Sequence, residues 1–363
     1  QKNPESILLH IHTLYRLTGK LDVTLFRKCL HHILKNEIIF NLYFKVAGDI
    51  PTCVFKECEH HHIDYIYLHD IESVCSVDEE VPYIEKQAET PINILSQPTY
   101  RLALYYSQQK DVFYLSAVLP HILIDAYSSD LFFKRLASLY NNGFKNMKDI
   151  RFSRLLSPVK QCNESVPVSA DYWHKKLSNH RLNLNLDNII SQGNSGADSC
   201  FIREYFTSRK DRHNALSQLA RRLRSTPFLV MMCVYALFLY RYTGQYEFSI
   251  LYPVDIRNKE QRRSLGCYVN LLPLQFNFHR NDTLADIIAD ITTQRKSNKP
   301  HERYPFAAIY KSARHCQNGI FNILFSKTRF LTNFTLKGIK VDNILLRSGH
   351  TGCDLSFLFD VNE

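Results

Sequence analysis

One short stretch, residues 120–126 (P-H-I-L-I-D-A), constrains the fold most, because it places an imidazole and a carboxylate four residues apart. It follows an apolar segment, 112–118, that predicts a buried strand, and Pro120 ends such a strand. Apolar side chains at helical spacing then predict a helix over about 128–140. Catalytic groups often lie where a rigid core strand meets a loop. His121 and Asp125 are therefore candidate site residues, and a hydrogen-bonded core histidine is the alternative.

Length and composition predict two lobes. A chain of 363 residues normally exceeds one hydrophobic core, and 45% hydrophobic residues supply ample core material. Each half mixes strand-like and helix-like segments, which indicates an α/β (α+β) fold. A polar stretch with two prolines, 157–169, predicts a linker. We therefore expect one lobe over 1–165 and a second over 170–363.

Several classes of protein are disfavoured. The longest apolar run, 228–240, is shorter than the roughly 20 residues that cross a bilayer, so no membrane span is expected. The ten cysteines are scattered without a C-x-x-C pair, and the sequence given opens without a leader, which favours reduced thiols and a cytoplasmic location. Gly-rich nucleotide fingerprints, H-E-x-x-H and G-x-S-x-G are absent from the sequence. Nucleotide-dependent chemistry and the commonest serine-hydrolase arrangement lose support.

The charged and metal-binding residue types point to a protein partner and to no metal. Cys53, Cys58 and the histidines at 60–62 crowd into one segment, whereas structural zinc usually joins two separated ligand pairs, so a solvated loop is expected. The formal net charge of +10 favours an acidic partner. Nucleic acid is a candidate, but the sequence has no long basic run and no RNA-recognition motif. An acidic protein fits at least as well, and we expect no nucleic acid.

Five further strings, in order along the chain, carry a family resemblance. They are A-D-Y-W at 170–173, L-Y-R-Y-T-G-Q at 239–245, G-C-Y-V-N-L-L-P-L at 266–274, H-E-R-Y-P-F at 301–306 and C-D-L-S at 353–356. Together with residues 120–126, which match H-H-x-x-x-D-G, they resemble the motifs of condensation domains of nonribosomal peptide synthetases. The resemblance covers nearly all 363 residues.

The resemblance implies a fold, a reaction and a set of residues. Such domains have two chloramphenicol-acetyltransferase-like lobes in a V-shaped pseudo-dimer, with a tunnel at the seam. They join an acyl thioester, held on the phosphopantetheine arm of a carrier protein, to an amine on a second carrier. No cofactor is then bound directly; the two carriers, which are typically acidic, belong to a larger multidomain chain. His121 takes the catalytic position, Asp125 the structural one, and Asn270 lines the tunnel.

This sequence departs from the family pattern at several positions. Pro120 replaces the first histidine of the motif, and Ala126 replaces its glycine, a change that matters if the position needs a positive φ. The family arginine that pairs with the motif aspartate falls at Phe40, and Arg101 on the neighbouring strand is the expected substitute. The sequence given also begins after the family's first motif and stops before its last strands, so an open sheet edge is expected.

Three interpretations of function follow. The first is an acyl-transferring condensation domain. The second is a degenerate, non-catalytic relative that binds a carrier or partner protein. The third is a stand-alone O-acyltransferase that uses coenzyme A, which the D-x-R string at 255–257 favours by resemblance.

Overall fold

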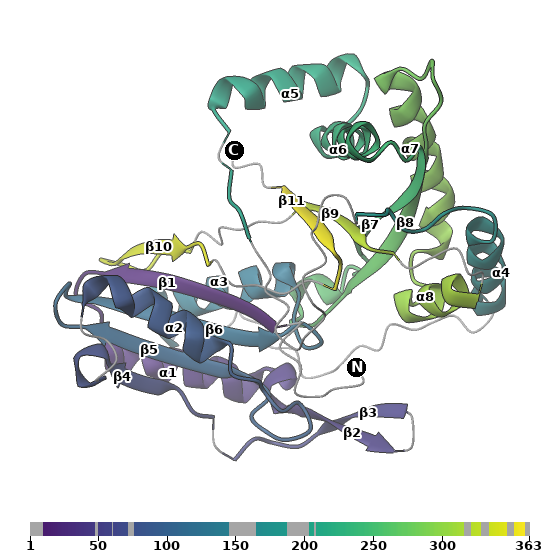
Figure 1. Ribbon diagram of the computed structural model, residues 1–363. Coiled ribbons are helices and arrows are strands. Elements are labelled where there is room, and N and C mark those ends of the chain that lie inside the picture. Colours follow the sequence, from purple (N-terminus) through teal and green to yellow (C-terminus); the bar gives the residue numbers. More distant parts are fainter. Residues whose placement is uncertain are drawn as a thin grey trace.

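Two sheet-and-helix lobes make up the protein (Figure 1). The computed structural model describes residues 10–47, 50–59, 61–71, 76–144, 165–186, 203–206, 208–315, 321–327, 334–346 and 352–359. Short 3-10 helices connect the larger elements at Ile38–Asn41, Leu68–Asp70, Val77–Glu79, Gln261–Arg263 and Lys299–His301. A separate hairpin pairs β2 (Leu42–Ala47) with β3 (Ile50–Phe55).

The first lobe is built on a mixed sheet of five strands in the order β10-β1-β6-β5-β4. These strands are β1 (His10–Thr18), β4 (Asp64–Tyr67), β5 (Arg101–Ser107), β6 (Val112–Pro120) and β10 (Lys340–Ile344). The central strand β6 is buried along its whole length and pairs antiparallel with β1 and β5. The predicted buried strand and its end at Pro120 are confirmed.

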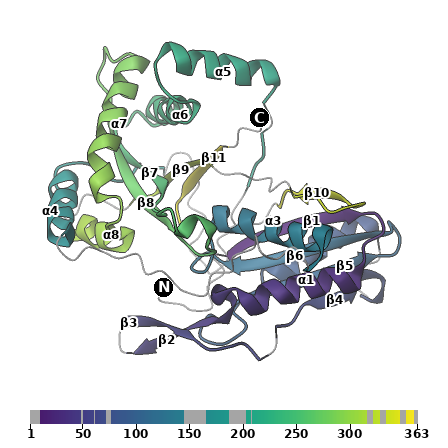
Figure 2. The same cartoon turned by 180° about the vertical axis from the view of Figure 1, so that it is seen from behind.

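Helices cover both faces of this sheet (Figures 1 and 2). On one face lie α1 (Val23–Asn36) and α3 (Ala126–Asn142), whose buried residues join the main core of the lobe. On the other face lies α2 (Glu80–Ala88), which packs on a smaller cluster. The predicted helix over 128–140 is confirmed and begins two residues earlier, because the side chain of Asp125 accepts the Ser128 N–H and caps it.

The second lobe is built on four strands in the order β11-β9-β7-β8. Its strands and helices are α4 (Ser165–Leu177), α5 (Lys210–Arg222), α6 (Pro227–Thr243), β7 (Glu247–Asp255), β8 (Val269–Asn277), α7 (Leu284–Asn298), α8 (Phe306–His315), β9 (Ile323–Lys327) and β11 (Leu355–Phe359). Trp173 of α4 is fully buried in its core. The predicted linker over 157–169 is partly wrong, since α4 begins at Ser165; residues 157–164 lie outside the described part of the chain.

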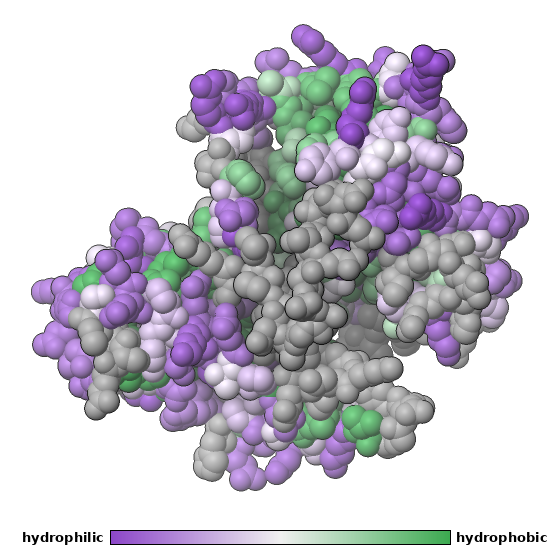
Figure 3. All heavy atoms as spheres, viewed as in Figure 1, coloured by the Kyte–Doolittle hydropathy of each residue, from purple (hydrophilic) through white to green (hydrophobic). Residues whose placement is uncertain are grey.

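Apolar side chains reach the surface of the second lobe around α6 (Figure 3). Val234, Phe238 and Tyr242, one helical turn apart, are 40%, 56% and 62% exposed. Taken singly, none of the helices described is both long and apolar enough for a membrane span; α5 and α6 reach that length and composition only as a pair bent by 98°.

One strand joins the two lobes. β10 lies in sequence between β9 and β11 of the second lobe, yet it pairs antiparallel with β1 of the first lobe, from Leu14↔Ile344 to Thr18↔Lys340. Phe334, Leu336 and Ile339, just before it, pack in the first-lobe core. The predicted division into residues 1–165 and 170–363 assigns β10 to the second lobe, whereas β10 belongs to the sheet of the first lobe. For the rest of the chain this division stays a prediction.

Candidate active site

His121 lies directly after β6, in a turn closed by a 2.9 Å hydrogen bond from the Leu123 N–H to the Pro120 carbonyl. The side chain is half-buried, and α3 begins five residues later. The sequence therefore folds as predicted here: a buried strand and a capped helix hold the histidine between them. The hydrogen bond found for its ring in the described part of the chain comes from the other lobe.

Asp125 is buried, and both of its oxygens are engaged. Oδ1 accepts the Ser128 N–H at 2.9 Å and the guanidinium of Arg257 at 2.6 Å. Oδ2 accepts the backbone N–H of Tyr268 at 2.8 Å. Two of these three donors come from the second lobe. The carboxylate therefore caps a helix and joins the lobes, and this supports the structural position that the family resemblance implies for it.

Arg257 is the cation of this site. Its side chain is 1% exposed and also bonds Asp255 at 3.2 Å and the hydroxyl of Ser128 at 2.7 Å. The rings of Tyr127 and Tyr268 lie 4.5 and 4.7 Å from the guanidinium carbon, at the distance of cation–π contacts. A buried guanidinium held by two carboxylates and two rings is a rigid support for the His121 turn.

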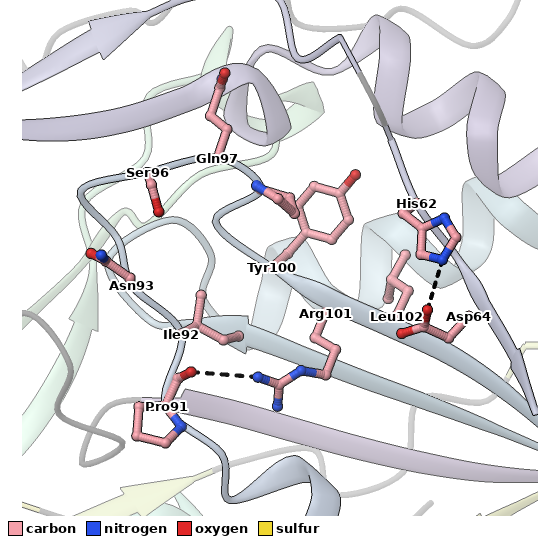
Figure 4. A pocket seen from close by; sticks show the side chains of 11 residues that line it. His62, Asp64, Pro91, Ile92, Asn93, Ser96, Gln97, Tyr100, Arg101 and Leu102 are labelled. Atoms are coloured by element: carbon pink, nitrogen blue, oxygen red, sulfur yellow. Dashed lines mark hydrogen bonds and ion pairs between the residues drawn. The ribbon is translucent and has the colours of Figure 1, made fainter.

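The prediction that Arg101 neutralises Asp125 is wrong. Arg101 instead donates to the backbone carbonyls of Gln87 at 3.0 Å, Thr90 at 3.1 Å and Pro91 at 3.4 Å. Figure 4 shows its guanidinium extending toward the Pro91 carbonyl in a hollow of the first lobe. Because these bonds hold the segment after α2, this arginine supports a loop rather than the site.

Phe40, which occupies the place of the family arginine, is packed in the core. Its ring makes edge contacts with Tyr100 at 5.2 Å and Phe132 at 5.6 Å. A buried ion pair between Glu37 and Arg135 also lies in the first lobe. Burial lowers the pKa of Arg135 to about 10, which leaves it charged at neutral pH. The position of the family arginine is thus filled by the Phe40 ring, and Arg257 of the second lobe is the cation that pairs with Asp125.

A loop of the second lobe, residues 266–268, is fastened to the motif. The hydroxyl of Ser128 donates to the Gly266 carbonyl at 2.8 Å and accepts its N–H at 3.0 Å. Between Gly266 and Tyr268, the sulfur of Cys267 lies 3.6 Å from Nδ1 of His121. Burial, and then the charge of Asp125, raises the pKa of the Cys267 thiol to about 11.

Asn270 is buried and bridges two segments of the second lobe. Its amide donates to the carbonyls of Glu302 and Tyr304, both at 2.8 Å, and its Oδ1 accepts the Phe306 N–H at 3.1 Å. It therefore joins the G-x-x-V-N string to the H-x-x-x-P-F string and supports the start of α8. Its predicted place in a tunnel wall stays a prediction.

The two substitutions in the motif fit the backbone. Pro120 is the last residue of β6 and lies opposite His10 of β1. Ala126 begins α3 and is exposed; among the described residues, the non-glycine residues with positive φ are Asp111 and Arg224. A glycine is therefore not needed at Ala126 for backbone conformation, and the cost expected from a positive φ does not arise.

In the cysteine–histidine segment at 53–62, the side chains of His61 and His62 contact side chains outside the segment. Nδ1 of His61 lies 2.7 Å from the Tyr100 hydroxyl, and His62 pairs with Asp64 at 2.8 Å. His60 lies outside the described residues. Within the described ranges, no three His, Cys, Asp or Glu side chains are gathered as metal ligands.

The site and the fold define an H-x-x-x-D acyltransferase architecture of the chloramphenicol-acetyltransferase type. The family model of the condensation domain matches residues 1–351, so the chain belongs to the condensation-domain family. Cyclosporin synthetase of Tolypocladium inflatum is 23% identical over 80% of the chain, and a component of the linear gramicidin synthase of Brevibacillus parabrevis is 23% identical over 92%. The chain spans only 2% and 4% of those two relatives.

Solved structures show the same fold. The first condensation domain of the calcium-dependent antibiotic synthetase, in complex with a substrate analogue, superposes with a TM-score of 0.78 at 16% identity, covering 98% of this chain and 83% of that one. The starter condensation domain of rhizomide synthetase, a double mutant in complex with C8-CoA and Leu-SNAC, gives 0.75 at 18% identity, covering 95% and 79%. The predicted family and fold class are confirmed.

Gly266 is required by packing, which gives a stability prediction. A Cβ there would lie 2.5 Å from the ring of Tyr268, which itself flanks Arg257. Gly266→Ala should therefore displace the ring and cost about 1–3 kcal/mol of unfolding free energy. Gly352→Ala is the control, because its Cβ would meet nothing within 4 Å, and it should change stability by about 0.5 kcal/mol or less. Urea titration of both variants measures the difference; equal stabilities would contradict the packing argument.

Proposed function

We propose that this chain transfers an acyl group from a phosphopantetheine thioester on a carrier protein to an amine, or a hydroxyl, in nonribosomal peptide or related synthesis. The observation that carries the proposal is the position of His121. It is a half-buried imidazole on a turn that Asp125 and Arg257 fix from both lobes. Membership of the condensation-domain family supports the same reaction.

The chemistry asks for one positioned base. A thioester is already activated, so most of the work is to bring two tethered reactants together. The acceptor nitrogen attacks the acyl carbonyl, a C–N bond forms and the C–S bond breaks. His121 takes the nitrogen-bound proton and returns it to the departing sulfur, which leaves as the thiol of the donor arm. Asp125 stays a support, because its oxygens are bonded to Ser128, Arg257 and Tyr268.

Two features favour catalysis over a degenerate binding role. The histidine is present, and the buried aspartate is paired with its cation. The changes at Pro120 and Ala126 lie in a regular strand end and a regular helix start. The D-x-R string no longer favours a stand-alone coenzyme A enzyme, since Asp255 and Arg257 belong to the network that holds Asp125.

Carrier domains with acidic surfaces are the proposed partners, in the cytoplasm and within a larger multidomain chain. The net charge of +10 supports this, because opposite charge speeds docking. The short coverage of the relatives supports the larger chain, since the matched synthetases are many times longer.

The proposal is tested with a loaded donor carrier and an amine acceptor. We expect a new amide by mass spectrometry and a KM for the carrier that rises several-fold when salt is raised from about 50 to about 500 mM, because the added ions shorten the Debye length. An acyl-N-acetylcysteamine thioester, which has no carrier surface, should show little salt dependence. Carrier binding without any acyl transfer would favour the non-catalytic interpretation, and transfer from acyl-coenzyme A alone would favour the stand-alone enzyme.

A further inference from the structure

Cys267 is held in place from both sides. Gly266 before it is bonded through its N–H and its carbonyl to the Ser128 hydroxyl, at 3.0 and 2.8 Å. Tyr268 after it donates its N–H to Asp125 at 2.8 Å. Both anchors belong to the start of α3, the helix that follows His121. The position of the Cys267 sulfur relative to the imidazole is therefore fixed by the same contacts that join the lobes.

The sulfur is the partner that the structure gives to the His121 ring. It lies 3.6 Å from Nδ1, and in the described part of the chain no other hydrogen bond to this side chain is found. Asp125 does not take that role in the described structure, where its oxygens accept hydrogen bonds from Ser128, Arg257 and Tyr268. In many catalytic histidines a carboxylate accepts a hydrogen bond from one ring nitrogen and so orients the ring. In His121 the corresponding nitrogen, Nδ1, faces the thiol of Cys267.

We propose that Cys267 is a positioning residue that accepts the Nδ1–H of His121 and so leaves the lone pair on Nε2, the nitrogen that takes the proton in the reaction. The inference rests on the proposed function and extends it. Which nitrogen of an imidazole carries the proton is set by the bond that the other one makes. A thiol sulfur is an acceptor for both the neutral ring and the imidazolium, so the contact persists when His121 becomes protonated.

The charge of the surroundings suits a neutral thiol. Burial and the nearby carboxylate of Asp125 raise the pKa of Cys267 to about 11, while a backbone hydrogen bond with Val269 and the charge of Arg257 act in the opposite direction. The sulfur therefore stays protonated at neutral pH and forms no thiolate–imidazolium pair. A neutral acceptor fixes the ring without binding its proton tightly, which leaves the imidazole free to exchange it.

The tautomer can be observed without turnover. In protein labelled with ¹⁵N-histidine, the signals of His121 are assigned among the 16 histidines by their loss in His121→Asn. We expect the neutral ring to carry its proton on Nδ1 and to leave Nε2 bare, and in Cys267→Ala we expect a shift toward the Nε2–H form. A wild-type ring with its proton on Nε2 would overturn the proposal, because the thiol would then be the donor.

Kinetics provide the second measurement. Cys267→Ala should lower kcat about 3–10-fold, less than the 10²–10⁴ that a positioned base contributes as a whole, with KM for the carrier unchanged. Cys353→Ala, a half-buried cysteine elsewhere in the second lobe, should match the wild type. Unchanged kcat and an unchanged pH profile in Cys267→Ala, beside an inactive His121→Ala, would overturn the role of the thiol while the proposed function stands. A wild-type chain without transfer would instead overturn the function, and the ¹⁵N signals would still report the tautomer.

Discussion

Replacing His121 by alanine should lower kcat for acyl transfer from a loaded carrier by about 10²–10⁴. The reason is chemical: in the proposed reaction the acceptor amine loses a proton as the C–N bond forms, and His121 is the half-buried imidazole on the turn after β6 that is proposed to take it. The hydrogen bond that the described structure gives this side chain goes to Cys267, so its removal should leave the fold and the affinity for the carrier nearly unchanged. Single-turnover assays with an acyl-loaded carrier measure the effect.

His62→Ala is the matched control for this experiment. His62 lies on the first lobe, exposed and 2.8 Å from Asp64, and its loss should leave kcat within twofold, about 0.4 kcal/mol of barrier. Wild-type turnover in His121→Ala would mean that the imidazole takes no part in the reaction. The chain would then be a condensation-like domain that binds a carrier or partner protein without transferring its acyl group.

Arg257→Met should cost about 3–5 kcal/mol of unfolding free energy, because it leaves the buried carboxylate of Asp125 without its cation. The same change should reduce acyl transfer strongly, since Arg257 also holds Ser128 and the carbonyl of Gly266, which lie beside the His121 turn. Chemical denaturation and single-turnover rates on the same samples measure both effects. The methionine keeps much of the volume of the side chain, so the loss reports on the charge and its hydrogen bonds.

Two controls separate this network from a general loss of packing. Arg101→Met removes bonds to three backbone carbonyls of the first lobe and should leave the transfer rate near the wild-type value. The double variant Asp125→Asn/Arg257→Met should be less unstable than Arg257→Met alone, because it removes the unpaired charge. If Arg101→Met abolished transfer while Arg257→Met did not, the assignment of the cation would be reversed.

The sequence predicts the local parts of this site well. The strand that ends at Pro120, the turn and the helix beyond Asp125 all follow from apolar spacing and capping between neighbouring residues. The lobes follow from chain length and from the order of the family strings. These features depend on neighbours in sequence, and periodicity reports such neighbours directly.

The contacts across the seam could not be predicted in the same way. Arg257 lies 132 residues from Asp125, whereas sequence neighbours favour Arg101, which lies on the adjacent strand. The D-x-R string at 255–257 was a visible signal, but without the packing of the lobes it pointed to a class of enzyme and not to a partner. The approach of Cys267 to His121 depends on the same packing, and Cys267 occupies the unspecified second position of its family string.

Strand β10 restricts how the two lobes can move relative to each other. The chain leaves the second lobe, adds an edge strand to the first sheet beside β1, and then returns to form β11. Any motion that separates the two lobes therefore has to turn about this strand or break its pairing with β1. The pairing of β10 with β1 thus limits how far the two lobes can separate. We therefore expect the lobes to move relative to each other by small rotations and not by a wide opening.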